Sequence, residues 1–254
     1  IEPMAAYRVP HPRKPQIERH ARRQTLAARV VGFVLLWGLV GLMSLVADRA
    51  IPREHLPWKT LKMIDPVGAS TKIKAARAGD DPAACRAILG QGGIEFAEVP
   101  QTGGACGVRD AVRLKSGLAP LSPADAPMTC KEALAFGLWE RQVVQPAAFD
   151  ELGQAVVAID HYGSYACRRQ YGKAEGPISE HASANAIDVA GFRLADGTVI
   201  SVARDWADTG PKGRFLRRVR DGGCRIFLTT LSPDYNVEHR DHFHLDMGGW
   251  PKCG

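Results

Sequence analysis

The chain has 254 residues, of which 45% are hydrophobic and 24% are charged, so its composition excludes a disordered or collagen-like protein. Its net charge of +6 is concentrated at the N-terminus, because residues 1–29 carry a net +5 and the rest of the chain only +1. Basic residues gathered beside a hydrophobic segment are typical of a membrane topology signal rather than of a nucleic-acid-binding face. We therefore expect no nucleic-acid partner.

An uncharged segment follows the basic tail, from Val30 to Ala47. As a helix it is about 27 Å long, which is enough to cross the hydrocarbon core of a bilayer. A cleaved signal peptide is the main alternative, but the apolar run exceeds the usual length of about 7–15 residues and the region before it is long. We predict an uncleaved transmembrane helix at 30–47, with a cytoplasmic tail at 1–29 and the remainder in the periplasm of a bacterial inner-membrane protein.

The cysteines agree with this topology, because all six follow the hydrophobic segment. An even number of scattered cysteines in an oxidising compartment predicts three disulfides, and the sequence contains no CxxC pair that would indicate a thiolate zinc cluster. Many connectivities are compatible with the sequence. Proximity along the chain favours the pairs Cys85–Cys106, Cys130–Cys167 and Cys224–Cys253.

The periplasmic part divides into a linker and a folded domain. Residues 48–80 contain Pro52, Pro57 and Pro66 and are expected to form a juxtamembrane linker, followed by a domain over 81–254. The expected elements of the first half of this domain are a short helix at 82–89, loops and short strands over 90–128, and a helix that begins with the capping box Thr129-Cys-Lys-Glu132.

The second half of the domain reads as strands with one basic helix. The expected strands are 156–159, 186–194, 199–202, 225–229 and 242–247, and the expected helix contains Phe215, Leu216 and Val219. The dipeptide Asp196-Gly197 predicts a hairpin turn between the second and third of these strands. Strands with a few flanking helices predict an α+β domain with a small antiparallel sheet.

Two stretches hold residues that could carry chemistry, 179–188 and 238–246. Alternation along a strand places His242, His244 and Asp246 on one face. Imidazole and carboxylate groups suit a zinc ion, and three protein ligands with one open position are typical of a catalytic rather than a structural site.

Asp188 is the most informative carboxylate of the first stretch. It lies between Ile187 and Val189 in an apolar strand, where an unpaired carboxylate is costly. A bound metal ion would offset that cost, and so would a buried hydrogen-bond network.

Together the two stretches resemble a known pattern. Stretch 179–188 resembles the SxHxxGxAxD motif of the M15 D-alanyl-D-alanine peptidases, and stretch 238–246 resembles the HxH or acid-x-x-His element of the lysostaphin-type, D-Ala-D-Ala and hedgehog zinc folds. The span from Cys85 to Cys253 more closely resembles the bacterial extensin-like C-terminal domain family. The segments that carry this resemblance are 163–168, 179–189 and 241–246.

The resemblance implies an M15/hedgehog-like fold and three zinc ligands, His181, Asp188 and His244. Ala184 stands where the motif has glycine, which raises the question whether the loop keeps the backbone conformation of the motif.

The resemblance also implies catalytic roles for neighbouring residues. Asp241 occupies the position of the acidic base, three residues before the last histidine ligand; His242 and then Glu238 are the alternatives. Either Arg168 or Arg169 is expected to stabilise the oxyanion of a tetrahedral intermediate.

These expectations lead to three functional readings. The first is a membrane-anchored, zinc-dependent peptidase or amidase, similar to D,D-carboxypeptidases or endopeptidases, that hydrolyses peptidoglycan stem peptides in the cell wall. The second is a catalytically inactive, metal-binding wall-binding or scaffold subunit of an envelope complex. The third has no metal, and hydrogen bonds satisfy the His/Asp cluster. An open position beside the metal favours the enzyme, and a side chain that fills it favours the scaffold.

Overall fold

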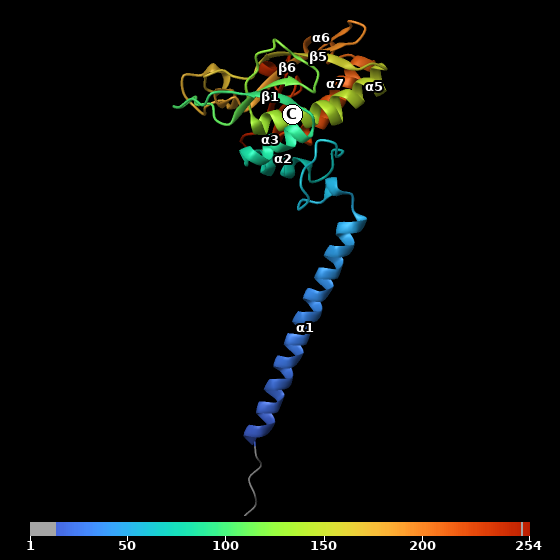
Figure 1. Ribbon diagram of the computed structural model, residues 1–254, viewed down its shortest axis with the longest axis vertical. Helices are drawn as coiled ribbons and strands as arrows, with labels where there is room; N and C mark the ends of the chain where they lie inside the picture. The colour runs from blue at the N-terminus through green and yellow to red at the C-terminus, as the bar shows by residue number, and fades with distance from the viewer. Residues whose placement is uncertain (1–13, 250) are drawn as a thin grey trace, which may run out of the picture. The chain divides into compact units, whose positions relative to one another are not determined.

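The computed structural model describes residues 14–249 and 251–254, and contacts divide the chain into two compact units at the boundary Ile51/Pro52. In the first unit, helix α1 runs from Lys14 to Ala50 (Figure 1). Its portion Leu26–Ala50 is the one helix of the described residues that is long and apolar enough to cross a membrane. This confirms the apolar helix expected at 30–47, and a helix of this kind near the N-terminus forms either a membrane span or a signal sequence. Residues 1–13 of the expected basic tail lie outside the described residues.

Most of the segment expected as a linker, 48–80, is folded as part of the second unit. Residues 48–50 continue α1, and the second unit begins at Pro52 with the short helices η1 (Arg53–His55) and α2 (Thr71–Gly79). Its apolar residues explain this, because Leu56, Leu61 and Met63 are buried. The prolines therefore mark turns of a folded segment that packs on the domain.

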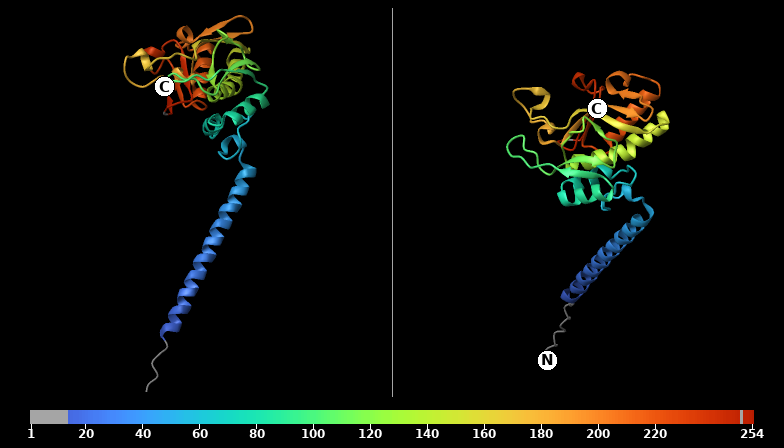
Figure 2. Two further views of the ribbon diagram at one scale, coloured as in Figure 1. Left: turned by 60° about the vertical axis from the view of Figure 1, so that its left-hand side comes forward. Right: turned by 45° about the horizontal axis from the view of Figure 1, so that its top comes forward.

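The second unit is the α+β domain that the sequence predicts. Its remaining helices are α3 (Pro82–Gln91), α4 (Cys130–Trp139), the π-helical turn η2 (Glu140–Val144), α5 (Gln145–Leu152), η3 (Gln170–Gly172), η4 (Glu180–Ser183), α6 (Val202–Asp205), α7 (Pro211–Cys224) and η5 (Val237–His239). Its strands are β1 (Glu95–Glu98), β2 (Ala111–Ser116), β3 (Leu121–Ser122), β4 (Met128–Thr129), β5 (Val156–Gly163), β6 (Ala186–Leu194), β7 (Val199–Ser201), β8 (Thr229–Leu231), β9 (Phe243–Asp246) and β10 (Lys252–Cys253). Helices α2 and α3 pack against α4, as Figure 2 shows.

The strands form two sheets. The smaller has the order β1-β2-β4, and the larger has the order β10-β8-β9-β6-β5-β3, with β7 also paired to β6. The pairings are antiparallel except at the two ends of the larger sheet, where β10 pairs with β8 and β3 with β5 in parallel. The hairpin predicted at Asp196-Gly197 joins β6 to β7, and Gly197 has the positive φ of 86° that such a turn needs.

The central strand β6 separates the hydrophobic core from the polar face of the sheet. Ile187 faces Leu245 of β9 and both are fully buried, whereas the next residue, Asp188, faces His244 on the other side. Further along β6, the ring of Phe192 lies 6.0 Å from that of Trp139 and 5.1 Å from that of Phe215. Helices α4 and α7 thus cover one face of the sheet, and the polar side chains gather on the other.

Two local predictions differ from the structure. The strand expected at 225–229 begins only at Thr229, because the end of α7 continues as a turn in which Ile226 and Phe227 both donate to the Gly223 carbonyl. The capping box is half formed. Thr129 Oγ1 accepts from the Glu132 N–H, but the Thr129 N–H donates to the Ala184 carbonyl and so is not available to the glutamate.

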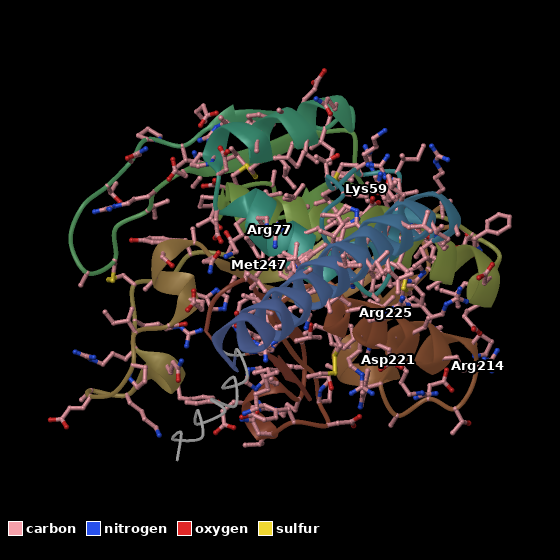
Figure 3. All side chains as sticks on the ribbon, turned by 90° about the horizontal axis from the view of Figure 1, so that it is seen from below. Lys59, Arg77, Arg214, Asp221, Arg225 and Met247 are labelled. Atoms are coloured by element: carbon pink, nitrogen blue, oxygen red, sulfur yellow. A yellow bond between two sulfur atoms is a disulfide. The ribbon has the colours of Figure 1, made fainter. Side chains whose placement is uncertain are left out.

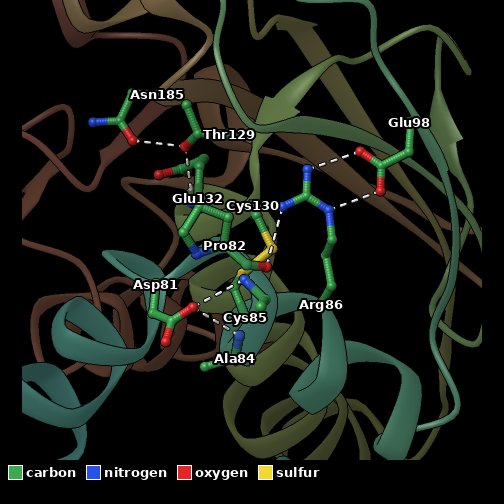
Figure 4. The surroundings of a disulfide bond; sticks show 11 residues. Asp81, Pro82, Ala84, Cys85, Arg86, Glu98, Thr129, Cys130, Glu132 and Asn185 are labelled. Carbon is green, nitrogen blue, oxygen red and sulfur yellow. Dashed lines mark hydrogen bonds and ion pairs between the residues drawn. A yellow bond between two sulfur atoms is a disulfide. The ribbon is translucent and has the colours of Figure 1, made fainter.

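The disulfide pairing predicted from proximity is wrong for two bonds and confirmed for one. The structure contains Cys85–Cys130, Cys106–Cys167 and Cys224–Cys253. Packing of α3 against the start of α4 brings Cys85 to Cys130 (Figure 4), although 45 positions separate them in the chain. Tertiary contacts between elements, rather than distance along the chain, determine these partners.

Candidate metal centre

Three elements bring together the ligands that the resemblance implies. His181 lies on η4, Asp188 on β6 and His244 on β9, where the strand register places it directly opposite Asp188. Between η4 and β6 the chain turns at Ala184, which has a left-handed φ of 58°. Alanine therefore keeps the conformation for which the motif uses glycine, at a cost of about 1–2 kcal/mol.

The three ligand atoms form a compact triangle. Asp188 Oδ1 lies 3.1 Å from His181 Nε2 and 3.0 Å from His244 Nδ1, and the two nitrogens are 3.1 Å apart. Ligands at about 2.0–2.1 Å from a tetrahedral zinc ion are separated by about 3.3 Å. The donor set therefore fits zinc in both chemistry and spacing.

The outer nitrogen of each imidazole has an acceptor that orients the ring. The Ser164 carbonyl lies 3.3 Å from His181 Nδ1, and the Asp246 carboxylate lies 2.9 Å from His244 Nε2. Because each of these partners accepts hydrogen bonds, the proton of each neutral ring belongs on its outer nitrogen. When both rings are neutral, as metal binding requires, the inner nitrogens present lone pairs towards the Asp188 carboxylate, and a cation stabilises this arrangement.

Without a metal ion, the charged forms of Asp188 and His244 are favoured. Burial raises the pKa of Asp188, but the hydrogen bonds and charges of His181 and His244 outweigh it and hold this pKa well below its usual range. Burial lowers the pKa of His244, whereas its bonds to Asp188 and Asp246 raise it, with a net result of about 9. A metal ion that binds at neutral pH therefore has to displace a proton from His244.

His242 and Asp241 form a pair beside the triad. Asp241 Oδ1 lies 2.8 Å from His242 Nδ1, and the other ring nitrogen, His242 Nε2, lies 3.5 Å from Asp188 Oδ1. The imidazole of His242 thus faces the ligands, and the carboxylate of Asp241 is behind it. Glu238 lines the surrounding pocket.

The triad lies in a pocket of about 730 Å³. One wall is the loop 164–179, which Cys167 joins to Cys106. Of the two candidate arginines in this loop, Arg168 lines the pocket, whereas Arg169 donates to the carbonyl of Gly176 within the loop. The structure therefore places Arg168, and not Arg169, at the site.

A comparison with known protein families finds a match, and it covers the region that contains the triad. The model of the family "Extensin-like protein C-terminus" matches residues 83–254, about two thirds of the chain. The chain belongs to this family. No curated protein and no solved structure matches it. The extensin-like region contains all six cysteines and the whole His/Asp triad, while α1 and α2 precede it.

The extensin-like region also places residues at the site to which the sequence assigned no role. His239 is buried in the pocket, where its ring contacts those of Tyr171, Tyr235, His242 and His244. Burial and the two neighbouring histidines lower the pKa of His239 to about 4, so it is neutral at pH 7. No spacing rule points to His239. Asp246, which orients the ring of His244, could have been found from the sequence, because strand alternation places both side chains on the same face.

The raised pKa of His244 predicts how the metal-free protein responds to pH. Its folded-state pKa of about 9 exceeds the unfolded value of about 6.5, so its contribution to stability is complete below pH 6.5 and is lost as pH rises to 9. We expect the free energy of unfolding to fall by about 3 kcal/mol over this window. Chemical denaturation of chelator-treated protein at pH 6.5 and 9 measures this, with His244→Gln as the control that should remove the pH-dependent loss. A profile that is flat or rises in the wild type would contradict the assignment.

Proposed function

We propose that this protein is a membrane-anchored, zinc-dependent peptidase or amidase that acts on peptidoglycan stem peptides. The observation that carries the proposal is the convergence of His181, Asp188 and His244 on one side of a large pocket, with each histidine oriented by an acceptor. The resemblance of this triad to that of the M15 and hedgehog-type zinc folds supports the same chemistry.

The roles of the remaining residues follow from their positions. A zinc ion held by the triad would supply Lewis-acid chemistry at the scissile carbonyl. His242 is better placed than Asp241 to take a proton from the attacking water, because its Nε2 faces the triad while Asp241 Oδ1 is bonded to its Nδ1. Asp241 then orients the imidazole, and Arg168 on the pocket wall is available for the oxyanion.

The proposed location is the periplasmic side of the bacterial inner membrane, with the N-terminus in the cytoplasm. The apolar helix Leu26–Ala50 and the basic residues before it support this orientation. Three disulfides in the domain support an oxidising compartment. An anchored enzyme of this kind would meet the cell wall directly.

Digestion of purified sacculi tests the proposal. The full chain with Zn²⁺ is expected to release peptide-containing fragments that mass spectrometry identifies, and the cleaved bond follows from their masses. His181→Ala should release none, because it removes a ligand from the triad. Wild-type protein that carries zinc and still releases nothing would refute the hydrolase.

One observation keeps a binding function as the second candidate. His242 Nε2 is only 3.5 Å from Asp188 Oδ1, so a small rotation of its ring could add a fourth ligand and close the open position. The protein would then be a zinc-stabilised wall-binding or scaffold subunit. Co-sedimentation with sacculi without fragment release, lost in His181→Ala, is the result that would favour it.

A further inference from the structure

Arg53, at the very start of the folded unit, contacts three residues that are close in sequence to exposed apolar side chains. The Arg53 guanidinium donates to the Thr60 carbonyl at 2.9 Å and pairs with Asp65 at 3.0 Å, and the Arg53 carbonyl accepts from Lys74 Nζ at 2.9 Å. Each of these three partners is next to, or two positions from, a large exposed apolar residue. These residues are Trp58, Ile64 and Ile73, which are 57%, 81% and 54% exposed.

Basic side chains accompany these three residues. Arg77 lies one helical turn after Ile73 on α2 and donates to the Pro57 carbonyl, which adjoins Trp58. Lys62 is exposed between Thr60 and Ile64. Figure 3 shows Arg77 together with Lys59 on the viewed face of the folded unit. We call Trp58, Lys62, Ile64, Ile73 and Arg77 the Arg53 patch.

Positive charge in the folded unit is concentrated in the segment that contains this patch. Residues 52–77 contain six basic and two acidic side chains, a net +4, whereas residues 78–254 carry a net −3. One of the two acids, Asp65, is already paired with Arg53. The segment that follows the apolar helix is therefore the positive part of an otherwise acidic domain, and it suits a negatively charged surface.

Chain connectivity limits how far this patch can be from a membrane. The apolar helix ends at Ala50, and Arg53, which three contacts hold in the folded unit, is only three residues later. Three extended residues span about 10 Å. When the helix crosses a bilayer, the surface around Arg53 is thus held close to the lipid headgroups.

We propose that the Arg53 patch rests on the bilayer surface, with its three apolar side chains at the boundary of headgroups and acyl chains and its two cations against anionic lipid headgroups. Tryptophan is favoured at this depth, and basic residues beside a membrane helix are attracted to an anionic lipid surface. The inference rests on the proposed membrane anchoring of α1. A docked patch fixes which side of the domain faces the membrane.

Quenching of tryptophan fluorescence tests this docking. The full chain is reconstituted in nanodiscs that contain anionic phosphatidylglycerol, with and without lipids brominated near the carbonyl end of the acyl chains. The contribution of Trp58, obtained by difference from Trp58→Phe, is expected to lose most of its intensity to the brominated lipid. The contribution of Trp206, which is bonded to Asp234 in another part of the domain, should stay unchanged and is the matched control. Ile64→Ser combined with Ile73→Ser should restore most of the Trp58 signal.

The outcomes separate this inference from the anchor on which it rests. Trp37, near the middle of the apolar helix, reports insertion through its own difference spectrum with Trp37→Phe, recorded with lipids brominated near the methyl end of the acyl chains. Quenching of Trp37 without quenching of Trp58 would overturn the docked patch and leave the anchor in place. Quenching of neither would overturn both. The sacculus assay, which depends on the metal centre, is independent of either result.

Discussion

The full chain, loaded with Zn²⁺ and freed of excess ion, is expected to contain about one zinc per chain, and its His181→Ala and Asp188→Ala variants almost none. Each variant removes one of three ligand atoms that lie 3.0–3.1 Å apart, and two ligands do not hold zinc against dialysis. Elemental analysis gives the stoichiometry directly. The control is His55→Gln, which changes a histidine outside the centre and should leave the zinc content unchanged.

A graded result is expected at Asp246. Its carboxylate orients His244 without belonging to the triad, so Asp246→Asn should weaken zinc binding by about 10–100-fold and still leave a detectable site. If the wild type bound no zinc after reconstitution at neutral pH, hydrogen bonds alone would account for the cluster and the hydrolase mechanism would be lost.

Replacement of His242 by alanine is expected to slow the release of wall fragments by about 10²–10⁴-fold, the usual contribution of a general base. Zinc content should stay near that of the wild type, because His242 lies outside the compact triangle of ligand atoms. Initial rates on sacculi, measured beside elemental analysis of the same samples, separate the two effects. Asp241→Asn should have a smaller effect on the rate, because it removes only the group that orients the ring.

Two results would contradict this role. An unchanged rate in His242→Ala would return Asp241 to first place as the base. Loss of zinc in His242→Ala would identify His242 as a fourth ligand, which would favour the scaffold reading over the enzyme.

Local patterns in the sequence were sufficient for several parts of this protein. The apolar helix follows from an uninterrupted run of uncharged residues, and strand β6 was predicted with its exact bounds from its apolar residues and the turn at Asp196-Gly197. The α+β class follows from the same local signals. The triad of candidate metal ligands follows from a motif match, and the structure brings those three residues together.

Other features depend on contacts between distant segments, and only the tertiary structure decided them. Cys85 pairs with Cys130 because α3 packs on α4. Residues 52–80 are part of the domain because several of their apolar side chains are buried in its core. His239 enters the pocket because η5 folds back beside β9. The sequence by itself determined which residues are the candidate ligands, since the motif specifies the type and spacing of each. The fold decided their order around the centre, since hydrogen-bond partners such as Ser164 and Asp246 are set by the path of the backbone.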